Sequence, residues 1–175
     1  MYNFIYKSRS AMKRFAVAFT GPSGSGKTTL VEKISKVLIR EREVAIIKHD
    51  PKDKGVFDKE GKDSHTFSQT GAEVVVTSST RTTYFSQRNK ELEEIIRMFN
   101  HFDILLVEGL KTLPLPRIAI FRNKIEESYL ECSEVIAIDS SIDIKKYNIP
   151  KNIDILDLNN TTQIIEWIDN NAKEV

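Results

Sequence analysis

An eight-residue stretch, residues 21–28, constrains this chain more than any other because it fits the pattern Gly-x-x-x-x-Gly-Lys-Thr. A short apolar run at residues 15–19 precedes it and is typical of a buried strand. After it, apolar residues recur at the spacing of one helical face: Leu30, Val31, Ile34, Val37 and Leu38. A glycine-rich loop between a strand and a helix is the arrangement that binds the phosphates of nucleoside triphosphates. The stretch therefore predicts a phosphate-binding loop.

Each part of this loop has a physical task at a triphosphate. Three glycines let backbone amides approach phosphate oxygens without the steric hindrance of a Cβ atom. The helix that follows adds the positive end of its dipole and its unpaired N–H groups. Lys27 is predicted to act catalytically by placing its charge on the β- and γ-phosphates, and the Thr28 hydroxyl is predicted to bind Mg²⁺. The predicted phosphate-binding set is Gly21, Ser23, Gly24, Ser25, Gly26, Lys27, Thr28 and Thr29.

The rest of the chain predicts one α/β domain of the P-loop NTPase type, a mostly parallel sheet with helices on both faces. Residues 44–47 form the next buried strand, and the resulting strand–helix–strand unit is expected to pair its strands in parallel. Further strands are expected at residues 74–76, 82–85, 104–107, 118–121 and 135–138. We expect the nucleotide-binding domain to span residues 14–175, with residues 1–13 as an N-terminal extension.

Three more helices are expected. Asp63 and Ser64 are placed to cap a short helix that Gly71 ends. A second helix is marked by the spacing of Leu92, Ile95, Ile96 and Phe99. The last begins near Asn160, where Gln163 is placed to complete a capping box. Its predicted buried residues are Ile164, Ile165 and Ile168.

Composition narrows the possible partners. The chain has 26 Lys and Arg against 25 Asp and Glu, so its charge gives no reason to expect nucleic acid or an acidic membrane surface as a partner. No apolar run approaches the roughly 18 residues of a membrane span, and residues 1–14 lack the apolar segment of a signal peptide. The single cysteine, Cys132, excludes an internal disulfide and a multi-cysteine metal site, and it fits a reducing, cytoplasmic compartment.

A second Mg²⁺ group is expected at the end of a strand beside the phosphate loop, where a carboxylate holds the metal through water. Asp103 and Glu108 flank the apolar residues 104–107. Ligands of an open parallel sheet lie at the carboxyl ends of its strands. Asp103 begins its strand and so lies roughly 16 Å from that end. We therefore assign the metal role to Glu108.

Two aspartates are further candidate catalytic residues. Asp50 follows the carboxyl end of the second strand, where it is placed to face the γ-phosphate or its attacking water; an Asx turn before Pro51 is an equally good interpretation. Asp58 begins an Asp-x-x-Gly pattern, which senses the γ-phosphate in GTPases, although a solvated loop also explains so short a pattern. His49 fits a packing or hydrogen-bonding role better than that of a base.

Longer segments resemble the MobB family, the molybdopterin-guanine dinucleotide biosynthesis adaptor proteins. The resemblance runs over residues 14–170, and its most discriminating parts are Gly-Lys-Asp-Ser at residues 61–64 and Val-Glu-Gly at residues 107–109. Other matching segments are residues 47–50, 57–60, 70–72 and 135–139. Two positions depart from the family pattern. Asp50 begins a stretch where the family commonly has a further histidine, and Leu110 replaces the usual aromatic residue.

The resemblance implies a GTP-binding protein that assists a MobA-like molybdenum-cofactor guanylyltransferase, the enzyme that attaches GMP to molybdopterin. It also implies Mg²⁺ beside the GTP, at most slow GTPase activity, and a homodimer, with molybdopterin as a further candidate partner. The preference for guanine rests on this resemblance. Residues 123–126, Asn-Lys-Ile-Glu, approach the Asn-Lys-x-Asp guanine reader of GTPases, but a charged turn after a strand explains them better.

Two other functions share parts of the pattern. A small-molecule P-loop kinase has the same loop and metal but needs several cations over the transferred phosphate. The arginines of this chain are instead scattered singly: Arg81, Arg88, Arg97, Arg117 and Arg122. A nucleotide-driven metal chaperone would need clustered cysteine and histidine ligands, whereas this chain has one cysteine and three dispersed histidines.

Overall fold

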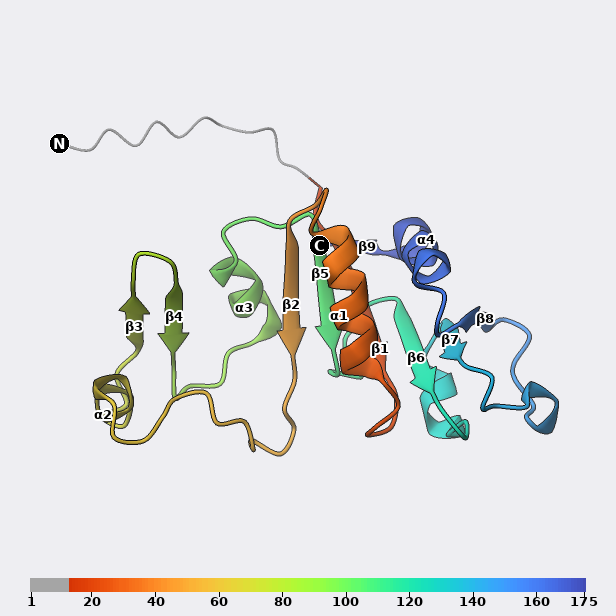
Figure 1. The fold of residues 1–175 in the computed structure, drawn as a ribbon, viewed down its shortest axis with the longest axis horizontal. Helices are drawn as coiled ribbons and strands as arrows, with labels where there is room; N and C mark the ends of the chain where they lie inside the picture. Colours follow the sequence, from red (N-terminus) through yellow and green to blue (C-terminus); the bar gives the residue numbers. More distant parts are fainter. Residues whose placement is uncertain (1–12) are drawn as a thin grey trace. The chain divides into compact units, whose positions relative to one another are not determined.

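The computed structural model describes residues 13–175 (Figure 1). The extension expected over residues 1–13 lies outside the described residues, apart from Lys13. The chain folds into two compact units. Unit 1 contains the chain up to His49 and from His101 to Val175, and unit 2 contains residues Asp50–Asn100. The sequence predicts one domain and does not indicate this subdivision.

Unit 1 is built on a seven-stranded sheet with the order β2-β5-β1-β6-β7-β8, in which β9 pairs with β1 outside this path (Figure 1). All pairings along the path are parallel, and only β9 runs antiparallel to its neighbour. This confirms the predicted α/β fold with a mostly parallel sheet. The strands are β1 (Phe15–Thr20), β2 (Val44–Lys48), β5 (Ile104–Glu108), β6 (Arg117–Phe121), β7 (Val135–Ile138), β8 (Asp154–Asp157) and β9 (Lys173–Glu174).

The central strands are buried along their length because their sequences are apolar runs, as parallel strands covered on both faces require. Strand β2 differs from the prediction of a buried strand. Ala45 and Ile47 are buried, but Ile46 between them is 44% exposed. β2 is an edge strand of the sheet, and its alternation shows that only one of its faces is covered.

Two α-helices, α1 (Lys27–Leu38) and α4 (Thr161–Asn171), pack on one face of the sheet and share one apolar core with it. Helix α1 buries the predicted residues except Val37, which is 44% exposed because it lies at the margin of the apolar face. In α4, Asn160 accepts a hydrogen bond from the Gln163 N–H, as predicted. The Gln163 side chain accepts from the Asp157 N–H instead of closing a capping box. The buried residues of α4 are Ile164, Trp167 and Ile168, with Ile165 only partly buried.

The other face is covered by the 3-10 helix η1 (Glu127–Cys132) and by neighbouring loops. Leu130 of η1 and Ile125 pack there against Phe121 of β6 and Ile136 of β7. A second 3-10 helix, η2 (Ile144–Lys146), contributes Ile144 to the same cluster. Unit 1 therefore has helices on both faces of its sheet.

Unit 2 contains the helices α2 (Asp63–Ser68) and α3 (Leu92–Met98) and the strands β3 (Val74–Thr77) and β4 (Thr82–Phe85). The strands occur where predicted, but they form a separate antiparallel pair instead of joining the parallel sheet. The predicted cap of α2 is wrong by one residue. Lys62 takes the capping position without a side-chain hydrogen bond, and Asp63 is the first helical residue.

Candidate nucleotide site

The phosphate loop connects the end of β1 at Thr20 to the start of α1 at Lys27. Its glycines adopt backbone angles that other residues rarely take, with φ of 138° at Gly21 and 97° at Gly26. A Cβ atom on Gly21 would also lie 2.3 Å from the carbonyl oxygen of Ile120. The loop can therefore take this path only because glycine stands at its entry, and Gly26 supplies the left-handed residue that begins α1.

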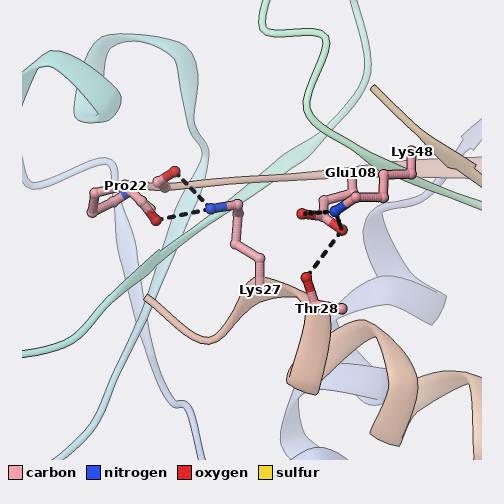
Figure 2. Close-up of polar contacts among 6 residues, drawn as sticks. Pro22, Lys27, Thr28, Lys48 and Glu108 are labelled. Atoms are coloured by element: carbon pink, nitrogen blue, oxygen red, sulfur yellow. Dashed lines mark hydrogen bonds and ion pairs between the residues drawn. The ribbon is translucent and has the colours of Figure 1, made fainter. Parts of the chain in front are cut away.

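Lys27 folds back over this loop. Its Nζ donates hydrogen bonds to the carbonyl oxygens of Gly21, at 2.9 Å, and Pro22, at 2.8 Å (Figure 2). Burial lowers the pKa of Lys27, the Glu108 carboxylate opposes this by raising it, and repulsion from Lys48 and Lys111 lowers it further. The ammonium group that is predicted to contact the terminal phosphates is thus held at the loop itself.

The structure brings Glu108 to the phosphate loop. Strand β5 pairs with β1 so that Glu108 lies level with Phe19, just before the loop begins. Helix α1 presents the Thr28 hydroxyl, whose Oγ1 donates to Glu108 Oε2 at 3.4 Å (Figure 2). Glu108 is buried, with 9% of its surface exposed. A hydroxyl and a carboxylate side by side are the oxygen groups that fit Mg²⁺, and these two residues would hold it.

Asp103 lies at the opposite end of the same strand. Its Oδ2 accepts the Glu43 N–H at 2.7 Å, and its own N–H donates to the Glu43 carbonyl at 2.8 Å. Asp103 therefore ties together the chain segments that precede β2 and β5. This is where the sequence analysis places it, away from the phosphate loop.

Lys48 is a site residue that the sequence analysis did not identify. It ends β2 and pairs in register with Glu108 on β5. Its Nζ lies 3.1 Å from Oε1 and 3.1 Å from Oε2 of Glu108 (Figure 2). The argument that site residues follow the carboxyl ends of strands, which selected Glu108 and Asp50, applies equally to Lys48.

The remaining residues of the predicted phosphate-binding set differ in their exposure. Ser23 and Thr29 are exposed, whereas Ser25 is buried. Among residues 13–175, the Ser25 hydroxyl is one of two buried side-chain oxygens that have no hydrogen-bond partner. A hydroxyl of this kind, inside a loop of backbone amides, is suited to a phosphate oxygen.

The two candidate catalytic aspartates belong to unit 2. The Asp50 carboxylate accepts hydrogen bonds from the backbone N–H groups of Lys52, Lys54 and Gly55, which is the Asx-type turn that the sequence allows. Asp58 Oδ1 accepts the Ser64 hydroxyl at 2.8 Å, ahead of α2. Both carboxylates thus organise their own loops, and their catalytic roles stay predictions. In unit 1, the backbone N–H of His49 donates to the Glu108 carbonyl at 2.9 Å, and the His49 side chain lies beside Gly109.

A second ion pair, between Arg122 and Asp139, lies against the phosphate loop after the end of β6. The Arg122 guanidinium packs against Gly26, 3.4 Å from where a Cβ atom would lie, and its Nε is 3.3 Å from Asp139 Oδ2. A hydrogen bond from the Ser141 side chain is the main cause that lowers the pKa of Asp139. In the segment that approaches a guanine reader, Lys124 pairs with Glu126 at 3.4 Å, as in a charged turn.

In residues 13–175 no helix is both long enough and apolar enough to span a membrane. Over the same residues, no three side chains of His, Cys, Asp or Glu are grouped so that they could hold a metal ion.

Comparisons with known proteins identify the family. The family model described as molybdopterin guanine dinucleotide synthesis protein B, MobB, matches residues 16–141. The molybdopterin-guanine dinucleotide biosynthesis adapter protein of Haemophilus influenzae is 34% identical over 88% of this chain and 87% of its own length. The Escherichia coli adapter protein is 30% identical over 87% of this chain and 92% of its own.

Solved structures agree on the fold. The crystal structure of Bacillus subtilis MobB has a TM-score of 0.70 at 22% identity, and covers 90% of this chain and 98% of that one. A crystal structure of molybdopterin-guanine biosynthesis protein B has a TM-score of 0.67 at 19% identity, and covers 89% and 98%. With a family model matched over most of its length and curated relatives that are at least 30% identical, the chain belongs to the MobB family.

Proposed function

We propose that this chain is a GTP-binding adapter in molybdopterin guanine dinucleotide biosynthesis, which assists a guanylyltransferase and does not transfer the nucleotide itself. One observation carries the proposal. This chain belongs to the MobB family, whose curated relatives are adapter proteins of this pathway. It also brings Lys27, Thr28 and Glu108 together at a phosphate loop. A homodimer, a cytoplasmic location and molybdopterin as a shared ligand belong to the same proposal.

The arrangement supports one orientation of the nucleotide. Mg²⁺ in P-loop proteins belongs to the terminal-phosphate end of the nucleotide, and Glu108, which would help to hold it, ends β5 beside β1. The triphosphate end therefore belongs on the β5 side, and the nucleoside on the β6 side. Arg122, which follows β6 and packs against Gly26, is placed beside the nucleoside end.

The metal assignment predicts different effects for the two acidic residues that flank β5. Replacing Glu108 with glutamine removes the charge that orients a metal-bound water, and should lower Mg²⁺ affinity in the nucleotide complex roughly tenfold or more. Asp103→Asn is the matched control, because Asp103 binds the Glu43 backbone at the far end of the strand. Calorimetric titrations of nucleotide at varied Mg²⁺ measure both. A larger effect for Asp103→Asn would contradict the metal assignment.

The charges near the triphosphate end support slow hydrolysis. Lys27 and Lys48 lie there, but Arg122 on the opposite side is engaged with Asp139. An arginine that stabilises the transferring phosphate accelerates hydrolysis strongly, so without one the isolated protein should turn over GTP on the order of once per minute or less. A protein of this kind holds GTP for another enzyme instead of consuming it.

A reconstituted assay tests the adapter function. Purified cognate guanylyltransferase, molybdopterin and limiting GTP are mixed with or without this protein, and the guanine dinucleotide form of the cofactor is measured. The wild type should raise the yield, and Lys27→Ala should cancel the gain. Lys36→Ala should keep it, because Lys36 lies on the exposed side of α1 in an ion pair with Glu32. No gain with the wild type, or rapid phosphorylation of a metabolite by this protein alone, would favour a small-molecule kinase instead.

A further inference from the structure

We propose that Lys48 is a second phosphate-binding lysine of this site. When Mg²⁺ and a nucleoside triphosphate bind together, the Lys48 ammonium breaks its ion pair with Glu108 and binds the terminal phosphate instead. Lys48 thereby determines the preference for triphosphate over diphosphate. The inference rests on the proposed function for the presence of a nucleotide and its metal. It adds to that function the residue that distinguishes the two nucleotide states.

The pairing of Lys48 with Glu108 is fixed by the sheet. The two residues face each other in register as the last residues of β2 and β5, so backbone hydrogen bonds hold them together. The ammonium lies 3.1 Å from each carboxylate oxygen, which centres its charge on the carboxylate. The Lys48 side chain is 59% exposed and that of Glu108 only 11%. Lys48 thus covers the open side of a nearly buried carboxylate, and its long stem remains free to turn away.

This ion pair competes with a metal. Glu108 Oε2, the oxygen nearest Thr28, accepts from the Thr28 hydroxyl at 3.4 Å and from Lys48 at 3.1 Å (Figure 2). A divalent ion placed between Thr28 and Glu108 would lie close to the Lys48 ammonium and be repelled by it. Metal binding without a nucleotide therefore breaks the ion pair between Lys48 and Glu108 and provides no new anion for the Lys48 ammonium.

A triphosphate changes this balance. Its terminal phosphate belongs on the β5 side of the loop, and β2 is the next strand in that direction. A Lys48 ammonium released from Glu108 would meet the γ-phosphate there, whereas a diphosphate offers no anion at that position. Metal binding and triphosphate binding should therefore strengthen each other through Lys48, as linkage between two sites requires. Lys27, which lies at Gly21 and Pro22, has the β-phosphate as a partner in either nucleotide state, so its removal should not distinguish the two states as removal of Lys48 does.

The test compares wild type with Lys48→Met, which keeps an unbranched stem and removes the charge. Mn²⁺ replaces Mg²⁺ so that metal binding can be followed by electron paramagnetic resonance, and nucleotide affinities are measured by calorimetry. In Lys48→Met, affinity for a non-hydrolysable GTP analogue with metal should fall about tenfold or more, with GDP affinity changed less than about twofold. Without nucleotide, Mn²⁺ affinity should rise about fivefold.

Two further variants make the result specific. Lys48→Gln, a polar neutral replacement, should repeat the loss of triphosphate preference and so exclude an effect of methionine packing. Lys36→Met removes a lysine from an exposed ion pair on α1 and should change none of these affinities. An unchanged ratio of triphosphate to diphosphate affinity in both Lys48 variants overturns the inference.

The outcome also separates this inference from the proposed function. Adenine analogues are titrated in parallel. A wild type that binds ATP better than GTP contradicts the guanine part of the proposed function but still shows whether Lys48 selects the triphosphate. A wild type that binds no nucleotide contradicts both. A wild type that selects GTP, with variants that behave like it, contradicts the role of Lys48 alone.

Discussion

Gly21→Ala is expected to destabilise unit 1 and to abolish measurable nucleotide binding. The new methyl group would lie 2.3 Å from the Ile120 carbonyl oxygen, and φ at this position is 138°. The methyl group would be fixed to the backbone directly after β1 and the oxygen belongs to the backbone of β6, so neither can move without disturbing one of these strands. Strain and overpacking together should lower the free energy of unfolding by about 2 kcal/mol or more. Chemical denaturation and calorimetry with a triphosphate analogue measure the two effects.

Gly24→Ala is the matched control for the effect of Gly21→Ala on stability. Gly24 also has a positive φ, 77°, but a Cβ atom there would meet no other atom within 4 Å. Its substitution should cost only the backbone strain, about 1–2 kcal/mol. The difference between the two variants isolates the clash with Ile120. Equal stabilities would show that the loop entry is more flexible than this geometry implies.

In unit 1, the sequence predicted the strands that are continuous apolar runs and missed those that are not. Residues 104–107, 118–121 and 135–138 are strands in the structure, because a buried parallel strand needs little else than apolar side chains. β8 carries an aspartate at each end and buries only Leu156, and it is held by backbone pairing with β7. β9 is two charged residues beside β1. No local pattern marks such strands.

The antiparallel pair in unit 2 was predicted as two strands but not as a separate sheet. β3 and β4 are joined by a turn in which the Ser78 N–H donates to the Arg81 carbonyl at 2.8 Å. Two short β-rich runs this close together are typical of a hairpin, so the antiparallel pairing could have been predicted from the sequence. The division into two units was not, because it depends on which contacts form across the whole chain.

The site was predictable where it is local in sequence and not where it depends on strand order. The loop, Lys27 and Thr28 follow from one motif, and Glu108 follows from its place at the end of an apolar strand. That Lys48 meets Glu108 follows only once β2 is known to pair with β5. Likewise, the contact of Arg122 with Gly26 requires β6 to lie next to β1. Residues from neighbouring strands come together through topology, which no single segment encodes.

The effect of removing Lys27 can be separated from any effect on folding. Its ammonium contacts only carbonyl oxygens of its own loop, at Gly21 and Pro22, among the hydrogen bonds of the described residues. Gly21 and Pro22 are only partly buried, so water can donate hydrogen bonds to both carbonyl oxygens once the lysine is removed. The apolar residues that anchor α1, among them Leu30 and Ile34, are untouched by the change.

Lys27→Ala should therefore weaken triphosphate binding at least tenfold while the fold survives. The ammonium would make charge-assisted hydrogen bonds to the terminal phosphates, each typically worth ~1.5–3 kcal/mol, and about 1.4 kcal/mol corresponds to a factor of ten. The loss should be smaller for GMP, which carries no β- or γ-phosphate. Lys36→Ala, about two and a half turns along the same helix and exposed, controls for the loss of one lysine from α1. Calorimetry measures the triphosphate affinity of both variants, and circular dichroism confirms that they fold. A folded Lys27→Ala protein that binds the triphosphate as tightly as wild type contradicts the assignment of the phosphate site.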